Sequence, residues 1–90
     1  MAVKAYKLLY ARLVKKELKK IPQDYREKII GKIRALVHDP FPPGAVTLQG
    51  ASGLFRIRSG DYRIIYEVRD SELIILVIKI GHRKEVYRKI

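Results

Sequence analysis

The sequence contains no cysteine. It can therefore form neither disulfides nor thiolate zinc sites, and it has no cysteine nucleophile. Long apolar runs are also absent, because charged residues make up 32% of the chain and are spread along its whole length, so no stretch is able to span a bilayer. The N-terminus lacks the basic, apolar and cleavage regions of a secretory signal. Together these absences predict a cytoplasmic protein.

Acidic residues are scarce. Nine Asp and Glu stand against 20 Lys and Arg, which gives a formal net charge of +11 over 90 residues. The excess lies on both sides of Gly53 and so does not form a detachable basic tail. It predicts an anionic partner, with nucleic acid first, an acidic protein second and an anionic membrane surface third. High solubility alone is also compatible with such a charge.

The hydrophobic content of 48% and the length of the chain predict one folded domain over residues 1–90. Residues 3–10 mix β-branched and aromatic side chains in rough alternation, which favours a strand. A first helix follows over residues 11–21, where Ala11, Val14, Leu18 and Ile21 form an apolar stripe. Pro22 ends it. A second helix, from Gln23 or Asp24 to His38, carries a wide apolar face formed by Tyr25, Ile29, Ile30, Ile33, Leu36 and Val37.

Residues 39–44 hold three of the four prolines and predict a rigid connection. Three strands are expected after it, over residues 54–58, 61–69 and 72–80, joined by turns at Ser59–Gly60 and Asp70–Ser71. The last residues, from His82, read as a short tail or one or two helical turns. The predicted fold class is α+β in the order β-α-α-β-β-β, with a two-helix hairpin packed on one face of a mostly antiparallel four-stranded sheet.

Strand alternation predicts a cationic cluster. If the apolar face of each strand packs on the helices, Arg56, Arg58 and Arg63 gather on the exposed face of the sheet. Like charges on neighbouring strands destabilise each other, so such a cluster favours an anionic ligand. The alternative is that these arginines are solvated and paired with acidic residues, namely Asp61, Glu67 or Glu72.

Two segments carry a family resemblance. Residues 54–66, Leu-Phe-Arg-Ile-Arg-Ser-Gly-Asp-Tyr-Arg-Ile-Ile-Tyr, and residues 81–87, Gly-His-Arg-Lys-Glu-Val-Tyr, follow a helix hairpin. This arrangement resembles the RelE/ParE superfamily of toxin-antitoxin proteins, and the RelE branch more than the gyrase-directed ParE branch. The resemblance covers nearly the whole chain.

The resemblance implies a ribosome-dependent mRNA endonuclease that cuts the codon in the ribosomal decoding (A) site. A ribose 2′-hydroxyl would attack the adjacent phosphate, leaving a cyclic phosphate and a free 5′-hydroxyl, without a metal or other cofactor. The implied partners are the ribosome, mRNA and a cognate RelB-like antitoxin that forms a heteromeric complex with the toxin. The resemblance implies no membrane partner. Two alternatives stay open: a ParE-like toxin that binds gyrase, and a nuclease-inactive member that acts in autoregulation with its antitoxin.

The resemblance also assigns roles to single residues. Arg63 matches the family arginine that stabilises the pentacoordinate phosphate, and its planar fork suits two oxygens. Arg83 would act on the same phosphate, Tyr87 would stack on a base or assist proton transfer, and Lys84 of the same motif would bind RNA. The structural alternative for Tyr87 is an aromatic side chain that pins the C-terminal segment to the sheet.

Arg56 and Arg58 depart from the family, in which lysines occupy these positions and one is a proposed general base. Because an arginine stays protonated, Arg58 is expected to act electrostatically and Arg56 to bind RNA. His82 is the candidate for a base or an RNA contact, since imidazole titrates near neutral pH; a local turn role is the alternative. His38, at a helix end, reads as structural. The basic face of the first helix, formed by Lys15, Lys16, Lys19 and Lys20, is either solvated or in contact with ribosomal RNA.

Overall fold

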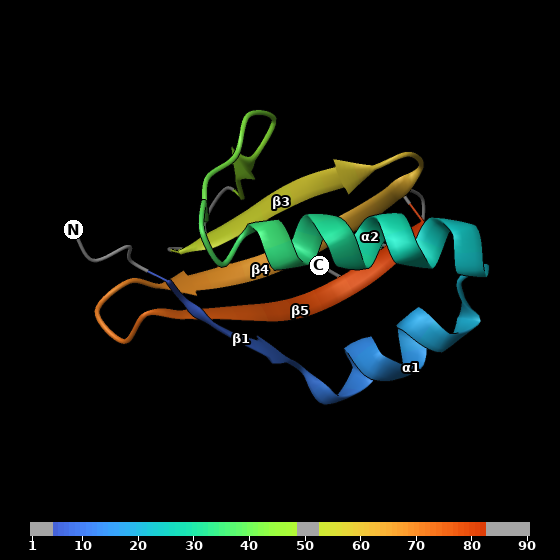
Figure 1. Ribbon diagram of the computed structural model, residues 1–90, viewed down its shortest axis with the longest axis horizontal. Helices are drawn as coiled ribbons and strands as arrows, with labels where there is room; N and C mark the ends of the chain where they lie inside the picture. Colours follow the sequence, from blue (N-terminus) through green and yellow to red (C-terminus); the bar gives the residue numbers. More distant parts are fainter. Residues whose placement is uncertain (1–4, 49–52, 83–90) are drawn as a thin grey trace.

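Two helices pack on one face of a five-stranded sheet in the computed structural model, which describes residues 5–48 and 53–82 (Figure 1). The elements are β1 (Lys7–Tyr10), α1 (Arg12–Lys20), α2 (Gln23–Ala35), β2 (Val46–Thr47), β3 (Leu54–Ser59), β4 (Tyr62–Arg69) and β5 (Ile74–His82). The predicted α+β class and the helix hairpin are confirmed. The predicted count of four strands is wrong, because β2 adds a fifth.

The sheet has the order β1-β5-β4-β3-β2. β1 runs parallel to β5, and all other pairs are antiparallel. The first strand therefore lies beside the last one, as the blue and red strands of Figure 1 show. β3, β4 and β5 form the predicted meander, so the strand that carries Arg63 lies between two neighbours.

β2 is a short edge strand that follows the proline-rich connection. Val46 pairs with Arg56 and Thr47 with Phe55, and the Leu48 amide donates to the Leu54 carbonyl at 3.0 Å. Two residues give too little periodicity for a sequence pattern to register. A short strand of this kind limits the length of free sheet edge.

The helices bury some of the apolar residues expected of them, whereas Leu18 and Ile30 are half-buried. Val14 of α1 and Ile29 and Ile33 of α2 are fully buried. Tyr25 differs from the prediction, because it is 51% exposed. It lies in the first turn of α2, where its ring contacts that of Tyr62 at 5.8 Å between centroids. α2 also ends at Ala35, before His38, since a turn occupies residues 36–38.

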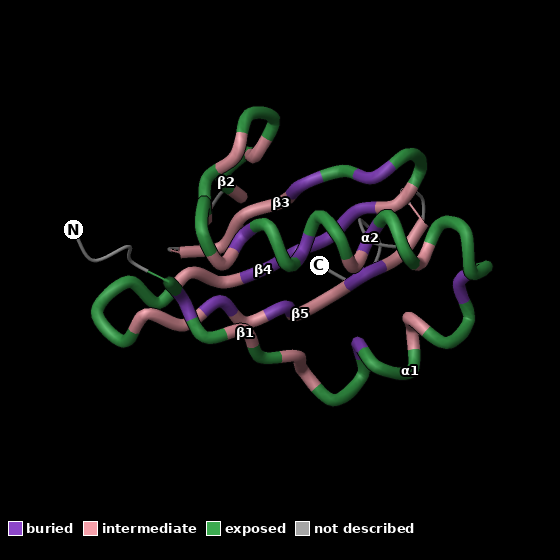
Figure 2. Tube along the Cα trace, viewed as in Figure 1, coloured by how far each residue is buried: buried purple, intermediate pink, exposed green. Residues whose placement is uncertain are grey.

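The core lies between the helices and the facing side of the sheet, where buried residues concentrate (Figure 2). Tyr66 is the largest fully buried side chain. Its hydroxyl donates to the Pro40 carbonyl at 2.7 Å, and its ring stacks on Phe55, which in turn meets Phe41 edge-on. This aromatic row fastens the proline-rich connection to the sheet.

The strand boundaries of the β4–β5 turn differ from the prediction by about two residues. β5 begins at Ile74 because residues 70–73 form the turn, with Leu73 at a φ of 56°. The Tyr6 hydroxyl donates to the Asp70 carboxylate and ties the start of β1 to this turn. β5 extends through His82, while the predicted tail over residues 83–90 lies outside the described residues.

Candidate nucleic-acid interface

The β3–β4 hairpin places two arginines directly opposite each other. β3 ends at Ser59 and β4 begins at Tyr62, so only Gly60 and Asp61 form the turn. Gly60 has a φ of 62°, which glycine adopts without the steric cost that a Cβ brings. This two-residue turn pairs Ser59 with Tyr62 and therefore Arg58 with Arg63. Side chains at opposed positions share one face of a sheet.

Arg56 belongs to the same face, two residues before Arg58, opposite Ile65. The predicted clustering of the three arginines is thus confirmed, and the face is the one turned away from the helices. Their exposure differs, however, since Arg58 is exposed, Arg56 is half-buried and Arg63 is only 9% exposed. The prediction that Arg63 lies exposed is wrong: Arg63 belongs to the inner strand β4 and has Arg58 of β3 opposite it.

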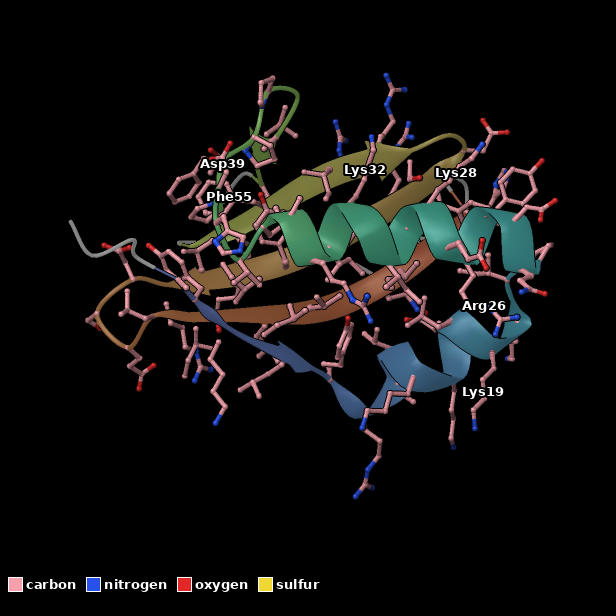
Figure 3. The ribbon with its side chains drawn as sticks, in the orientation of Figure 1. Lys19, Arg26, Lys28, Lys32, Asp39 and Phe55 are labelled. Atoms are coloured by element: carbon pink, nitrogen blue, oxygen red, sulfur yellow. The ribbon has the colours of Figure 1, made fainter. Side chains whose placement is uncertain are left out.

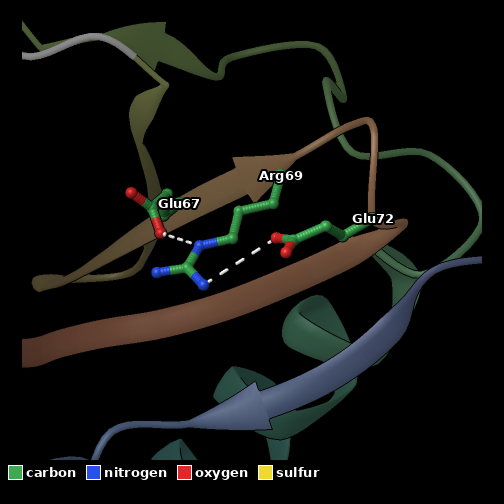
Figure 4. Close-up of polar contacts among 3 residues, drawn as sticks. All are labelled: Glu67, Arg69 and Glu72. Atoms are coloured by element: carbon green, nitrogen blue, oxygen red, sulfur yellow. Dashed lines mark hydrogen bonds and ion pairs between the residues drawn. The ribbon is translucent and has the colours of Figure 1, made fainter.

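Two carboxylates, those of Glu67 and Glu72, lie near the other end of β4. Arg69 Nε donates to Glu67 Oε1 at 2.7 Å, and Arg69 Nη1 lies 3.9 Å from Glu72 Oε2 (Figure 4). The hydrogen bond to Glu67 raises the pKa of the Arg69 guanidinium. Six residues along the strand separate Arg69 from Arg63, about 20 Å at the rise of a β-strand. Glu67 and Glu72 therefore interact with Arg69 at the far end of the strand from Arg63.

Lys32 of α2 contacts the backbone of β3 at Arg58, on the helix-facing side of the sheet, and the sequence did not predict this contact. Its Nζ donates to the Arg58 carbonyl at 2.7 Å, from the side of α2 that faces β3 (Figure 3). Lys32 and Arg58 also line a cavity of about 380 Å³, whose wall includes Pro42 and Pro43. The sequence could not predict this contact, because it joins a helix to a strand that is distant along the chain.

His82 lies on the other face of the sheet from Arg63. It pairs with Tyr62 at the end of β5, and the two rings meet edge-on with 6.0 Å between centroids. Tyr62 packs against the helix-facing core, whereas the residue opposite Arg63 is Gly81. Since alternate residues of a strand face opposite sides, the structure does not bring His82 and Arg63 together. A role for His82 as base or RNA contact stays a prediction.

The three remaining candidates, Arg83, Lys84 and Tyr87, lie outside the described residues. Within residues 5–48 and 53–82, no three histidine or carboxylate side chains are grouped so that they could hold a metal ion. In the same ranges, neither helix has the length and apolar character needed to cross a membrane.

The arginine face suits an anionic ligand. Two guanidinium groups at opposed positions repel each other, and an anion between them relieves that repulsion. Each guanidinium offers a planar fork of donors that matches two oxygens of a phosphate. The arrangement can therefore hold a phosphodiester and stabilise additional negative charge that develops on it.

Comparison with known proteins identifies the family of this chain. The family model described as "ParE toxin of type II toxin-antitoxin system, parDE" matches residues 8–87. The chain belongs to the RelE/ParE toxin family. Among curated relatives, the mRNA interferase toxin RelE of Escherichia coli K12 is 32% identical over 87 residues, covering 92% of this chain and 90% of the relative. Toxin RelG of Mycobacterium tuberculosis is 22% identical over 85 residues, covering 93% and 98%.

Solved structures of RelE/ParE toxins share the fold. RelE in the archaeal RelE–RelB complex from Pyrococcus horikoshii superposes with a TM-score of 0.80 at 27% identity, covering 90% of this chain and 98% of that one. The isolated E. coli RelE toxin gives a TM-score of 0.78 at 28% identity, with 94% of each chain covered. Two helices on a mostly antiparallel sheet are thus a property that this toxin has in common with RelE.

Proposed function

We propose that this RelE/ParE toxin is a ribosome-dependent mRNA endonuclease that cuts the codon in the ribosomal A site. The observation that carries the proposal is the cross-strand pair of Arg58 and Arg63 on one sheet face, with Arg56 beside it. A relative of 32% identity is named an mRNA interferase, which supports the same reaction class. Inhibition of translation follows from the loss of intact message.

The proposed reaction is attack by a ribose 2′-oxygen on the adjacent phosphorus, with the P–O5′ bond breaking. Arg63 binds the non-bridging oxygens and stabilises the charge that grows on them, and Arg58 adds a second guanidinium from the neighbouring strand. Neither guanidinium acts as the base: the 2′-hydroxyl proton passes to solvent and the departing 5′-oxygen takes up a proton, which leaves a cyclic phosphate and a free 5′-hydroxyl. By resemblance, Arg83 assists at the same phosphate, and Tyr87 orients the base.

Control by a RelB-like antitoxin completes the proposal. Structures that resemble this toxin include RelE–RelB complexes, among them the intact complex from E. coli. A net charge of +11 favours an acidic partner segment that covers the arginine face. The toxin would then be held inactive by direct coverage of the groups that bind phosphate.

The test maps cuts in a defined mRNA by primer extension, with purified toxin and programmed ribosomes. Codon-phased cuts that require the ribosome are expected, and Arg63→Ala is expected to lower their rate by about 10²–10³-fold, as for other groups that stabilise transition-state charge. Arg12→Ala removes the same charge from exposed α1 and should leave the rate within about twofold. Equal rates for wild type and Arg63→Ala would contradict the role of Arg63.

A second candidate function rests on the family model, whose description names the ParE toxin. In this alternative the toxin binds DNA gyrase and does not cut RNA. Inhibition of gyrase supercoiling by purified toxin, without cuts in ribosome-bound mRNA, would favour it. A folded toxin that lacks both activities and does not slow growth would instead be a nuclease-inactive member acting in autoregulation.

A further inference from the structure

A second cavity opens at the end of the sheet where β4 begins and β5 ends. Its volume is about 310 Å³, at the lower end of the range for small-ligand sites. Among the residues that line it are Glu17, Lys20, Tyr62, Lys79, Ile80 and His82. The cavity thus combines charged groups of α1 and β5 with two aromatic rings.

The Glu17 carboxylate of this cavity already has hydrogen-bond donors within the protein. Glu17 accepts a hydrogen bond from the Ile80 amide at 3.1 Å and a second one, as an ion pair, from the Lys79 ammonium. Both side chains of the ion pair are less than one-fifth exposed. The pair therefore forms a fixed, electrically neutral wall of the cavity.

Lys20 supplies a cation that this pair does not neutralise. Within the part of the chain that the structure describes, neither the Lys20 ammonium nor the His82 ring has a hydrogen bond or an ion pair. The rings of Tyr62 and His82 meet at an interplanar angle of 79°, so each presents a different surface to the cavity. An anion with an attached aromatic ring is the ligand that matches a lysine beside two rings.

The cavity lies next to the arginine pair but on the other face of the sheet. Tyr62 precedes Arg63 in β4, and His82 follows Gly81, which is opposite Arg63. Only the rise of one strand residue, about 3.3 Å, separates the two positions along β4. Gly81 has no side chain, so among the described residues β5 places no side chain opposite Arg63 at this end of the sheet.

We propose that this cavity binds one nucleotide of the RNA, the one next to the phosphate held at Arg63. Its base lies against Tyr62 and His82, and its phosphate binds Lys20. This inference rests on the proposed function, because it assigns the cavity to the same RNA strand. It adds a subsite that would select the nucleotide flanking the cut.

The test uses adenosine 5′-monophosphate as probe and follows the imidazole proton resonances of the full-length toxin by NMR. The sequence has two histidines, so His38, in the turn that follows α2, serves as an internal reference. We expect saturable shifts of the His82 resonances without shifts of His38. Lys20→Gln should weaken binding about tenfold, as expected when a charge-assisted hydrogen bond is lost. Lys19→Gln, on the outer side of α1 and pointing away from the sheet (Figure 3), should leave it unchanged.

Several results would overturn the subsite. Equal weakening by Lys20→Gln and Lys19→Gln would show general charge attraction, and saturation without His82 shifts would place the nucleotide elsewhere. Inorganic phosphate that binds as tightly as the nucleotide would exclude a role for the rings. Because this titration needs neither ribosomes nor cleavage, it separates failure of the subsite from failure of the nuclease proposal.

Discussion

Tyr66 shows how a single polar atom can fix a loop to a sheet. The phenol is fully buried, and its hydrogen bond to the Pro40 carbonyl satisfies both groups. Burial raises the pKa of Tyr66 from 10.0 to about 12, since the core disfavours the phenolate. Burial also raises the pKa of Tyr10, and the hydrogen bond to Asp70 raises that of Tyr6.

Stability should therefore fall in alkali. The unfolded chain loses the Tyr66 proton near pH 10, while the folded protein keeps it to about pH 12. The contribution is complete below pH 10 and is lost as the pH rises to 12, which amounts to about 2–3 kcal/mol. Urea unfolding at several pH values measures it. Tyr66→Phe should show a correspondingly shallower decline, whereas Tyr25→Phe, at an exposed position, should follow the wild type.

Glu17 covers a free stretch of sheet edge. β1 ends at Tyr10, opposite Val77, so the Ile80 amide has no strand beside it and donates to Glu17 instead. Glu17→Ala should lower the free energy of unfolding by about 2–3 kcal/mol, because it leaves the amide and Lys79 without their acceptor. Glu17→Gln keeps an acceptor for the amide and should cost about half as much.

The control for Glu17 is Glu27→Gln on exposed α2, which should change the free energy of unfolding by less than about 0.5 kcal/mol. Denaturant titrations of the three variants at neutral pH decide the matter. If Glu17→Gln were as harmful as Glu17→Ala, the ion pair and not the edge amide would be the main contribution.

Among the strands and helices, the β3–β4 hairpin was the most predictable part. Alternation together with the Ser-Gly-Asp turn gave both strands, their apolar face and the shared face of the three arginines. The helix hairpin followed from 3.6-residue periodicity and Pro22. Alternation does not show which inner-strand residues their neighbours cover, so the burial of Arg63 could not be predicted. β2, at two residues, has no periodicity to read.

Two glycines should respond oppositely to alanine. Gly60 has a φ of 62°, so a Cβ there brings strain of about 1–2 kcal/mol. Gly31 lies inside α2 with no atom within 4 Å of an added Cβ, so Gly31→Ala should stabilise by about 0.5–1 kcal/mol. Denaturant unfolding of the two variants compares the signs. Stabilisation by Gly60→Ala would contradict the predicted strain and show that the turn adapts while the β3–β4 register is kept.

Contacts between the helices and the sheet could not be predicted from the sequence. Lys32 reaches the Arg58 carbonyl from α2, and Glu17 reaches β5 from α1. Both contacts depend on where each helix lies over the sheet, and surface lysines and glutamates carry no periodic signal of their partners. The face of the sheet on which His82 lies could not be predicted either, because it depends on the length of β5. Once the strand runs through residue 82, alternation turns its ring away from Arg63.

The molecule as a whole carries a charge of +11, and this should govern how fast it meets its antitoxin. Complementary charge accelerates encounter and is screened by salt. We expect the association rate constant with an antitoxin partner to fall at least about tenfold between ~0.05 M and ~0.5 M NaCl. The dissociation rate should change much less. Stopped-flow or surface-binding kinetics measure both, and a salt-independent association rate would contradict charge steering.

The parallel pairing of β1 with β5 also determines when the fold can be completed during synthesis of the chain. Lys7 needs Ile74 as its partner, so the N-terminal strand waits unpaired while every residue between them is translated. Long-range pairing of this kind slows folding, and β4 gains its second neighbour only with β5. The growing chain therefore leaves the ribosomal tunnel with an incomplete sheet, and β1 finds its partner only once the last strand has emerged.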